Sequence, residues 1–137
     1  MKIIICGSIS AAKEILEVKV KLEKTGHEVE IPEGVKHFDE WEGDGAGKLE
    51  KADRKIKHDL IRGYYEKMKN YDAVLIVNSK KKEIEGYIGG NTFLEMGFAH
   101  VLNKKMYCLY SLPEISYTSE IMAMQPVILN GDLTKIQ

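Results

Sequence analysis

Apolar positions follow two different periods along this chain, and each period predicts one kind of element. A branched apolar run closed by a glycine is typical of a strand buried on both faces. The run at the start of the chain, closed by Gly7, has this form and predicts a central strand. Such runs and shorter alternating segments predict five strands, the last of them minor: Lys2–Cys6, His27–Ile31, Ala73–Val77, Met106–Tyr110 and Val127–Leu129.

Between these runs, apolar residues recur every three or four positions, which predicts amphipathic helices. The predicted helices are Ala11–Leu22, Ala52–Asn70, Phe93–Leu102 and Thr118–Met124. Strands that alternate with helices pair in parallel through right-handed crossovers, and such sheets bind ligands beyond the carboxyl ends of their strands. The pattern therefore predicts a flavodoxin-like, three-layer α/β/α fold with a five-stranded, mainly parallel sheet.

One polar, glycine-rich segment, Pro32–Gly47, follows neither period and carries the only tryptophan, Trp41, in its middle. Irregular chain of this length is typical of a functional loop or lid. A disordered insertion anchored by Trp41 explains the same composition equally well.

Length and charge narrow the classes of function. With 137 residues, 44% of them hydrophobic, the chain has the size and composition of a single globular domain covering residues 1–137. A formal net charge of −1 argues against broad electrostatic binding to nucleic acid or to a membrane surface. We interpret the basic run Lys80–Lys82 as a solvated loop.

The two cysteines, Cys6 and Cys108, end apolar runs and have no neighbouring metal-ligand partner, so neither a disulfide nor a zinc site is predicted. The histidines show no metal spacing, and we expect neither a metal nor a cofactor. No signal peptide is visible, and no stretch approaches the roughly 20 apolar residues of a membrane span. We therefore expect a soluble, cytoplasmic protein.

The turn Gly7–Ser10 follows the first strand and opens a helix, so its N–H groups and hydroxyls are placed to bind an anion such as phosphate. A plain tight turn explains the same residues. The full dinucleotide-binding fingerprint is missing, and the segment that ends in Gly47 lacks the pattern of a phosphate-binding P-loop.

Segment Gly86–Gly97 is the most informative in the chain. Its glycines allow close approach of backbone to a ligand, and Glu95 is predicted to lie in the first turn of a helix, where the dipole favours an ionised carboxylate. Such a carboxylate can attack an electron-deficient carbon. Alternatively, Thr92 and Glu95 form a capping box, in which the glutamate only satisfies an N–H at the helix end.

Two residues of the second predicted helix, Asp59 and Tyr64, are candidates to orient a sugar hydroxyl or to donate a proton, although polar residues on a surface helix face are the commoner explanation. Met122 and Met124 are placed to cover a flat ring, or else pack in the core.

Three segments together make this chain resemble the nucleoside 2-deoxyribosyltransferase superfamily, which includes deoxynucleoside-monophosphate N-glycosidases. They are Ile5–Ile9 (ICGSI), Asp72–Asn78 (DAVLIVN) and Gly90–Ala99 (GNTFLEMGFA), and the last is the most specific. The resemblance extends over almost the whole chain.

This resemblance implies that Glu95 is a nucleophile that attacks the anomeric carbon and expels the base. It also implies a symmetric homo-oligomer of dimer size or larger, in which a neighbour's short helix lends Ser119 and Met122 to the pocket. The substrate-binding residues implied or inferred are Cys6, Gly7, Ser8, Ile9, Asn78, Gly89, Gly90, Asn91, Ser119 and Met122.

The sequence departs from the family at several expected partners. An expected tyrosine is Ile4, one expected aspartate is Gly89, and a second is replaced by Tyr64, with Asp59 further back on a different helix face. The leading hypothesis is cleavage or transfer of the N-glycosidic bond of a nucleoside or nucleotide. A non-catalytic nucleotide-binding or sensor domain is the main alternative, and flavin binding or an interaction module remains a third.

Overall fold

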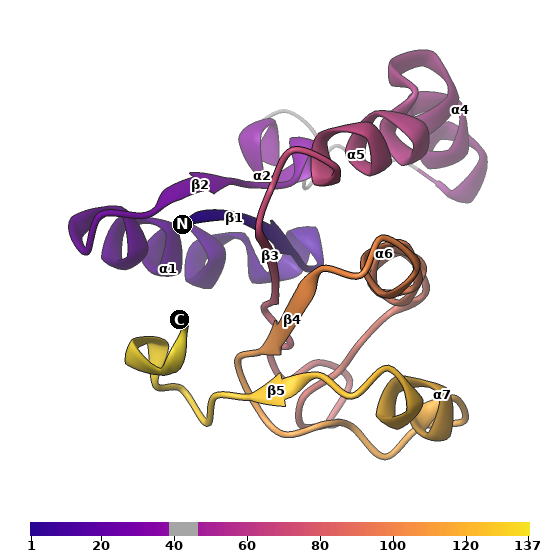
Figure 1. Ribbon diagram of the computed structural model, residues 1–137. Coiled ribbons are helices and arrows are strands. Elements are labelled where there is room, and N and C mark those ends of the chain that lie inside the picture. Colours follow the sequence, from indigo (N-terminus) through magenta and orange to yellow (C-terminus); the bar gives the residue numbers. More distant parts are fainter. Residues whose placement is uncertain (39–46) are drawn as a thin grey trace.

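The computed structural model describes residues 1–38 and 47–137. Five strands form one parallel sheet in the order β2-β1-β3-β4-β5, with every neighbouring pair parallel (Figure 1). The strands are β1 Lys2–Cys6, β2 Glu28–Glu30, β3 Ala73–Ile76, β4 Lys105–Cys108 and β5 Val127–Ile128. The predicted flavodoxin-like α/β fold is therefore confirmed, with all the pairing parallel rather than most of it. The strand order reverses direction between β1 and β3, which is where such sheets bind ligands.

Helices cover both faces of this sheet. The helical elements are α1 Ala12–Lys24, α2 Glu33–Lys36, α4 Lys48–His58, α5 Leu60–Met68, α6 Gly90–Val101 and α7 Thr118–Ala123, with 3₁₀ turns η1 Ile9–Ala11 and η2 Leu133–Lys135. None of the helices in the described ranges is both long and apolar enough to cross a membrane. Figure 1 shows α1 on one face of the sheet and α5 and α6 on the other.

Strand β1 is central because it contributes to the core on both faces. Successive side chains of a strand point to opposite sides. Ile3 and Ile5 accordingly pack with α1, whereas Ile4 and Cys6 pack with α5, α6 and α7. All four side chains are fully buried, as the unbroken apolar run predicts. The end of β1 thus reaches the ligand-binding edge of the sheet between two packed layers.

The helix predicted over Ala52–Asn70 is two helices, and this prediction was wrong. Asp59 adopts a left-handed conformation with a φ of 48° and separates α4 from α5. The apolar residues before the break do not reach the core, since Ile56 is 77% exposed, whereas Tyr64 and Met68 after it are buried. A regular spacing of four residues cannot reveal such a break, because each half keeps the same period. The break directs α4 away from the sheet and along the pocket described below.

Part of the segment predicted to be irregular is ordered. Pro32 precedes α2, whose single turn buries Val35 against the α1 side of the core. Pro32 is the N-cap residue, with a φ of −59° and a ψ of 145°, and its ring fixes the φ at which the chain enters α2. Trp41 lies outside the described residues.

Candidate functional site

A pocket of about 400 Å³ opens at the carboxyl ends of β1 and β3. The turn after β1, helix α2, the α4–α5 segment and the start of α6 all contribute to its wall. The residues predicted from the sequence that line it are Gly7, Ser8, Ile9, Tyr64, Gly89, Gly90, Asn91 and Glu95. The structure therefore brings the turn after β1 and the candidate carboxylate to a common cavity.

The turn after β1 is held in shape by its own serines. Ser8 precedes η1, where its hydroxyl accepts from the N–H of Ser10 at 3.3 Å and lies 2.8 Å from the Ser10 hydroxyl. A β-carbon at Gly7 would lie 3.0 Å from Cδ1 of Ile15 and 3.1 Å from the carbonyl oxygen of Val77. A side chain at Gly7 would therefore force its neighbours to shift by a few tenths of an ångström, while Ser8 borders the pocket.

Glu95 lies deeper in its helix than the sequence suggested. Helix α6 begins at Gly90, with Gly89 in the N-cap position, and the N–H of Phe93 bonds the carbonyl of Gly89 at 2.9 Å. Glu95 is therefore in the second turn, and the first turn holds no acidic residue. Thr92 lies inside the helix, so the capping-box alternative is wrong, and so is the first-turn placement. The side chain of Glu95 instead borders the pocket and is only 7% exposed.

The charge of Glu95 is governed by its burial. Desolvation raises the pKa of its carboxyl group to about 8, while the hydrogen bond from the Cys6 thiol and the positive charge of Lys55 act in the opposite direction. Cys6, which was predicted to bind substrate, is fully buried and does not line the pocket. Burial holds the pKa of its thiol well above the ordinary value. Near neutral pH, Glu95 is therefore largely a protonated acid.

Tyr64 borders the pocket with its hydroxyl already engaged. The hydroxyl donates to the carbonyl oxygen of Ile5 on β1, and the side chain is buried. Burial raises the pKa of Tyr64, and the nearby Cys6 and Glu95 raise it further. Tyr64 therefore ties α5 to the central strand and keeps its proton at neutral pH.

Asp59 does not reach this pocket. Its side chain is exposed and forms an ion pair with Arg62, with Nη1 and Oδ2 3.2 Å apart. Asp59 could replace the expected aspartate only if its helix were shifted toward the pocket. Asp59 instead lies at the break between α4 and α5, so its side chain points elsewhere. Of the two acid candidates on this segment, only Tyr64 lines the pocket.

Asn78 holds two loops together rather than lining the pocket. Its amide nitrogen donates to the carbonyl oxygens of Tyr110 and Ser111 at 3.0 and 3.1 Å, and to that of Gly86 at 3.4 Å. Its side-chain oxygen accepts from the N–H of Tyr110 at 2.9 Å. The residue is 1% exposed, and its polar atoms are used by the loops after β3 and β4.

The two residues proposed to act across an interface lie on α7, outside this pocket. Met122 is 61% exposed, and the exposed Ser119 donates to the carboxylate of Glu120 at 3.0 Å. Their contribution to a neighbouring subunit stays a prediction. The alternative of core packing for Met122 is wrong, since the side chain faces outward.

Sequence reasoning missed the cations of the pocket. Lys51, Arg54 and Lys55 line it from α4, and Lys81 lines it from the loop after β3. The signal was present in the spacing of the first three, because residues three and four apart share one face of a helix. Interpreting the basic run as a solvated loop was wrong for Lys81, whose Nζ lies 3.3 Å from Oγ of Ser8.

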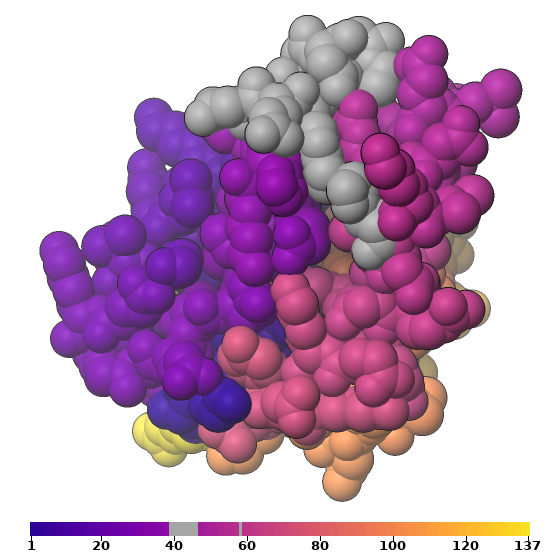
Figure 2. All heavy atoms as spheres, turned by 90° about the horizontal axis from the view of Figure 1, so that it is seen from above, coloured from indigo at the N-terminus to yellow at the C-terminus, as the bar shows by residue number. Residues whose placement is uncertain are grey.

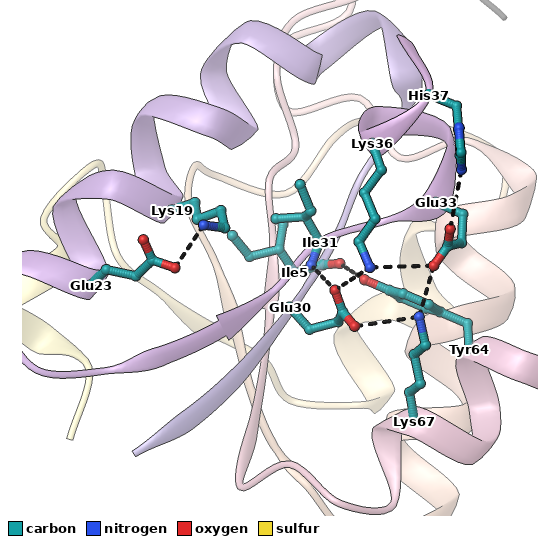
Figure 3. Close-up of polar contacts among 10 residues, drawn as sticks. All are labelled: Ile5, Lys19, Glu23, Glu30, Ile31, Glu33, Lys36, His37, Tyr64 and Lys67. Carbon is teal, nitrogen blue, oxygen red and sulfur yellow. Dashed lines mark hydrogen bonds and ion pairs between the residues drawn. The ribbon is translucent and has the colours of Figure 1, made fainter. Parts of the chain in front are cut away.

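Four charged side chains also connect α2 to α5 beside the pocket. Nζ of Lys67 lies 2.8 Å from Oε1 of Glu33 and 3.3 Å from Oε2 of Glu30, and Nζ of Lys36 lies 2.7 Å from Oε1 of Glu30 (Figure 3). Figure 2 shows the corresponding surface, on which the purple atoms of α2 lie against the pink atoms of α5. These ion pairs hold the α2 wall of the pocket to the helix that carries Tyr64.

Comparison with models of known protein families finds no match, and comparison with curated proteins finds none of significant similarity. The resemblance to the nucleoside 2-deoxyribosyltransferase superfamily thus rests on the three segments quoted above. Within residues 1–38 and 47–137, no group of three or more His, Cys, Asp and Glu side chains is arranged to hold a metal ion.

Proposed function

We propose that this protein cleaves or transfers the N-glycosidic bond of a nucleoside or nucleotide, with Glu95 as the nucleophile. The observation that supports this proposal is the shared pocket: the buried carboxyl group of Glu95 and the turn Gly7–Ile9 border one cavity at the switch point of the sheet. A volume of about 400 Å³ is within the range of small-molecule sites. The pocket wall also includes the aromatic ring of Tyr87 and the apolar side chain of Leu60, surfaces suited to a flat base.

The proposed reaction needs Glu95 in its ionised form. A carboxylate oxygen attacks the anomeric carbon while the bond to the base breaks; the base leaves with the bonding electrons and takes up a proton from water. The resulting glycosyl ester is opened by water, or by the nitrogen of a second base in a transfer. The positive charge of Lys55 favours the ionised form that this step requires.

A non-catalytic nucleotide-binding or sensor domain is the second candidate, and the pKa of Glu95 favours it. A carboxyl group with a pKa of about 8 is mostly neutral at pH 7 and is then a poor nucleophile. Glu33, the other acidic residue lining the pocket among the described residues, is engaged in ion pairs with Lys36 and Lys67. A sensor would use the same cavity without needing a charge on Glu95.

Incubation with a panel of nucleosides and their 5′-monophosphates, followed by chromatography for free base, separates the two candidates. We expect the wild-type protein to release base and Glu95→Gln to release none. Glu114→Gln, which changes an exposed glutamate outside the pocket in the same way, serves as the matched control and should keep full activity.

The same panel is then used in thermal-shift titrations. A ligand at a hundred times its dissociation constant stabilises the folded state by about 2.7 kcal/mol. Stabilisation without release of base would support the sensor and contradict the enzyme. Neither stabilisation nor release with any member of the panel would contradict both.

A further inference from the structure

Departure of the base from the sugar calls for a proton donor in the pocket. The base leaves far more readily when a side chain gives a proton to its ring nitrogen as the bond breaks. Neither residue that the sequence suggested for this role can fill it. Asp59 is exposed and lies outside the pocket, and the hydroxyl of Tyr64 already donates to the carbonyl oxygen of Ile5. The donor therefore has to come from another residue of the pocket wall.

Two further ionisable residues of the described pocket wall are engaged elsewhere. The carboxylate of Glu33 is paired with Lys36 and Lys67, which lower its pKa, so it carries no proton to give at neutral pH. The ammonium group of Lys81 is directed to the turn after β1, where Nζ lies 3.3 Å from Oγ of Ser8. These contacts leave the cations of α4 as the nearest candidates.

Lys55 is the α4 cation that lies beside the reacting carboxyl group. Its Nζ is 3.5 Å from the side-chain oxygen of Asn91. Asn91 and Glu95 are four residues apart on α6, so their side chains are neighbours on one helix face, and both line the pocket. The charge of Lys55 acts on the carboxyl group of Glu95. This placement suits an acid, because the acid and the nucleophile of a retaining glycosidic reaction lie only about 5 Å apart.

The other two α4 cations of the pocket are less suited to this role. Lys51 is exposed and lies one helical turn before Lys55, further from the contact with Asn91. The guanidinium group of Arg54 keeps its protons at any pH at which the protein is folded. Lys55 is half-buried, and its ammonium group on a flexible stem can follow the departing base.

We infer that Lys55 is the general acid of the proposed reaction and that its ammonium group gives a proton to the departing base. This inference rests on the proposed function and names a second catalytic residue for it. As a carboxylate oxygen of Glu95 bonds to the anomeric carbon, the electrons of the broken C–N bond pass to the ring nitrogen, which takes a proton from Nζ of Lys55. Water then reprotonates the amine, so the proton reaches the base from the solvent through this side chain.

The balance of charge supports this pairing of roles. Before the step, the ionised carboxylate of Glu95 and the ammonium group of Lys55 face the same cavity with opposite charges. Formation of the ester removes the negative charge, and transfer of the proton removes the positive one. The step therefore leaves no unpaired charge in a partly buried site, where such a charge is costly.

Lys55→Arg separates proton donation from charge. Arginine keeps the positive charge but gives up no proton near neutral pH. With the nucleoside or monophosphate that the wild type cleaves fastest, Lys55→Arg and Lys55→Gln should both lower kcat by about a hundredfold and change KM by less than about threefold. A wild-type kcat in Lys55→Arg would overturn the inference, because charge alone would then suffice. A loss confined to KM would overturn it as well.

Two further measurements exclude an indirect effect. Lys57→Gln removes the same charge from an exposed side chain of α4 outside the pocket and should keep full activity. NMR of carbon-13-labelled glutamate carboxyl groups should show the titration midpoint of Glu95 near its wild-type value in Lys55→Arg, since the neighbouring charge is kept. A midpoint that moves as far in Lys55→Arg as in Lys55→Gln, with a parallel loss of kcat, would assign Lys55 an electrostatic role only and overturn the inference.

Added amines test the proton transfer directly. In Lys55→Ala, ethylammonium can occupy the space of the missing side chain and donate a proton, whereas tetramethylammonium has the same charge and no proton to give. We expect release of base to increase with the concentration of ethylammonium and not with that of tetramethylammonium. Equal effects of the two ions would overturn the inference. So would a loss of kcat in Tyr87→Phe, which removes the hydroxyl of another pocket residue, without one in Lys55→Gln.

The release assay distinguishes failure of this inference from failure of the proposed function. A wild-type protein that releases no base from any member of the panel defeats the proposed function, and this inference with it. Release of base by the wild type and, at the same rate, by Lys55→Arg defeats the role of Lys55 alone.

Discussion

The buried thiol of Cys6, at the end of β1, is hydrogen-bonded to the carboxyl group of Glu95 on α6. Burial raises the pKa of Glu95 to about 8, and the thiol and the charge of Lys55 offset part of that effect. The pocket thus contains an acid that loses its proton only above neutral pH, and two neighbouring side chains favour its ionised form.

Replacing Glu95 should change how stability depends on pH. Its folded pKa of about 8 exceeds its ordinary value of 4.5, so the native state binds the proton more tightly than the unfolded chain does. That contribution is fully present below about pH 4.5 and is lost as pH rises to about 8. Relative to wild type, Glu95→Gln should therefore gain stability between pH 5 and pH 8.5, by roughly 1.4 kcal/mol for each unit of pKa displacement. Urea denaturation at the two pH values measures the free energy of unfolding of each protein. A difference between variant and wild type that is the same at both pH values would contradict the raised pKa.

Removal of the Cys6 thiol should make Glu95 harder to ionise. Cys6→Ala deletes the hydrogen bond that favours the charged carboxylate, so the titration midpoint of Glu95 should move to higher pH. NMR of the carbon-13-labelled glutamate carboxyl groups follows this directly. Cys108→Ala is the matched control, because Cys108 is equally buried on β4 and does not act on Glu95. A midpoint that stays in place in Cys6→Ala would exclude the hydrogen bond as a determinant.

Loss of the ion pairs between α2 and α5 should lower stability in a salt-dependent manner. Lys67→Gln removes partners of Glu30 and Glu33, whose side chains are 18% and 29% exposed, and should cost about 1 kcal/mol at low salt and less at about 1 M salt. Lys69→Gln, whose partner Glu66 is 59% exposed, should cost less than about 0.5 kcal/mol. Chemical denaturation at both salt concentrations provides the comparison. Equal costs for the two variants would show that the pairs beside the pocket add nothing beyond a surface contact.

These ion pairs should also weaken in acid. The pKa values of Glu30 and Glu33 are both lowered. Desolvation acts to raise the pKa of Glu30, but Lys36 and Lys67 together lower it by more. For Glu33 the hydrogen bond from Lys67 is the largest cause. A lowered folded pKa gives stability that is present above the ordinary value of 4.5 and lost as pH falls below it. The difference between wild type and Lys67→Gln should therefore shrink between pH 6 and pH 3.

Gly86 should tolerate no side chain. It has a φ of +67°, and a β-carbon there would lie 2.0 Å from the carbonyl oxygen of Ser111. Gly86→Ala should therefore destabilise the protein by about 3 kcal/mol or more. Gly26→Ala shares the left-handed φ, at +92°, but meets no atom within 4 Å, and should cost only about 1 kcal/mol. Thermal denaturation of the two variants separates the effect of the steric clash from that of the left-handed backbone. Equal losses of stability in both variants would show that backbone conformation alone accounts for the destabilisation.

The hydrophobic period of the sequence predicted a helix correctly only where its apolar positions are buried in the structure. The apolar spacing through Tyr64 and Met68 correctly marked a buried face, but the same spacing at Ile56 marked an exposed one. The break at Asp59 is a single left-handed residue, and nothing in the hydrophobic period registers it. Similarly, Thr92 and Glu95 match a capping pattern that the earlier start of α6 makes irrelevant.

The sequence by itself determined the sheet: its unbroken apolar runs require burial on both faces, and their alternation with helices requires parallel pairing, so the fold and the edge that holds the pocket both follow. It also pointed to Glu95 and to the turn at Gly7. Only the tertiary structure decided which charges meet there. Lys55 and Lys81 lie far apart along the chain, and their approach to one cavity depends on the break at Asp59 and on the path of the loop after β3, which no local pattern encodes.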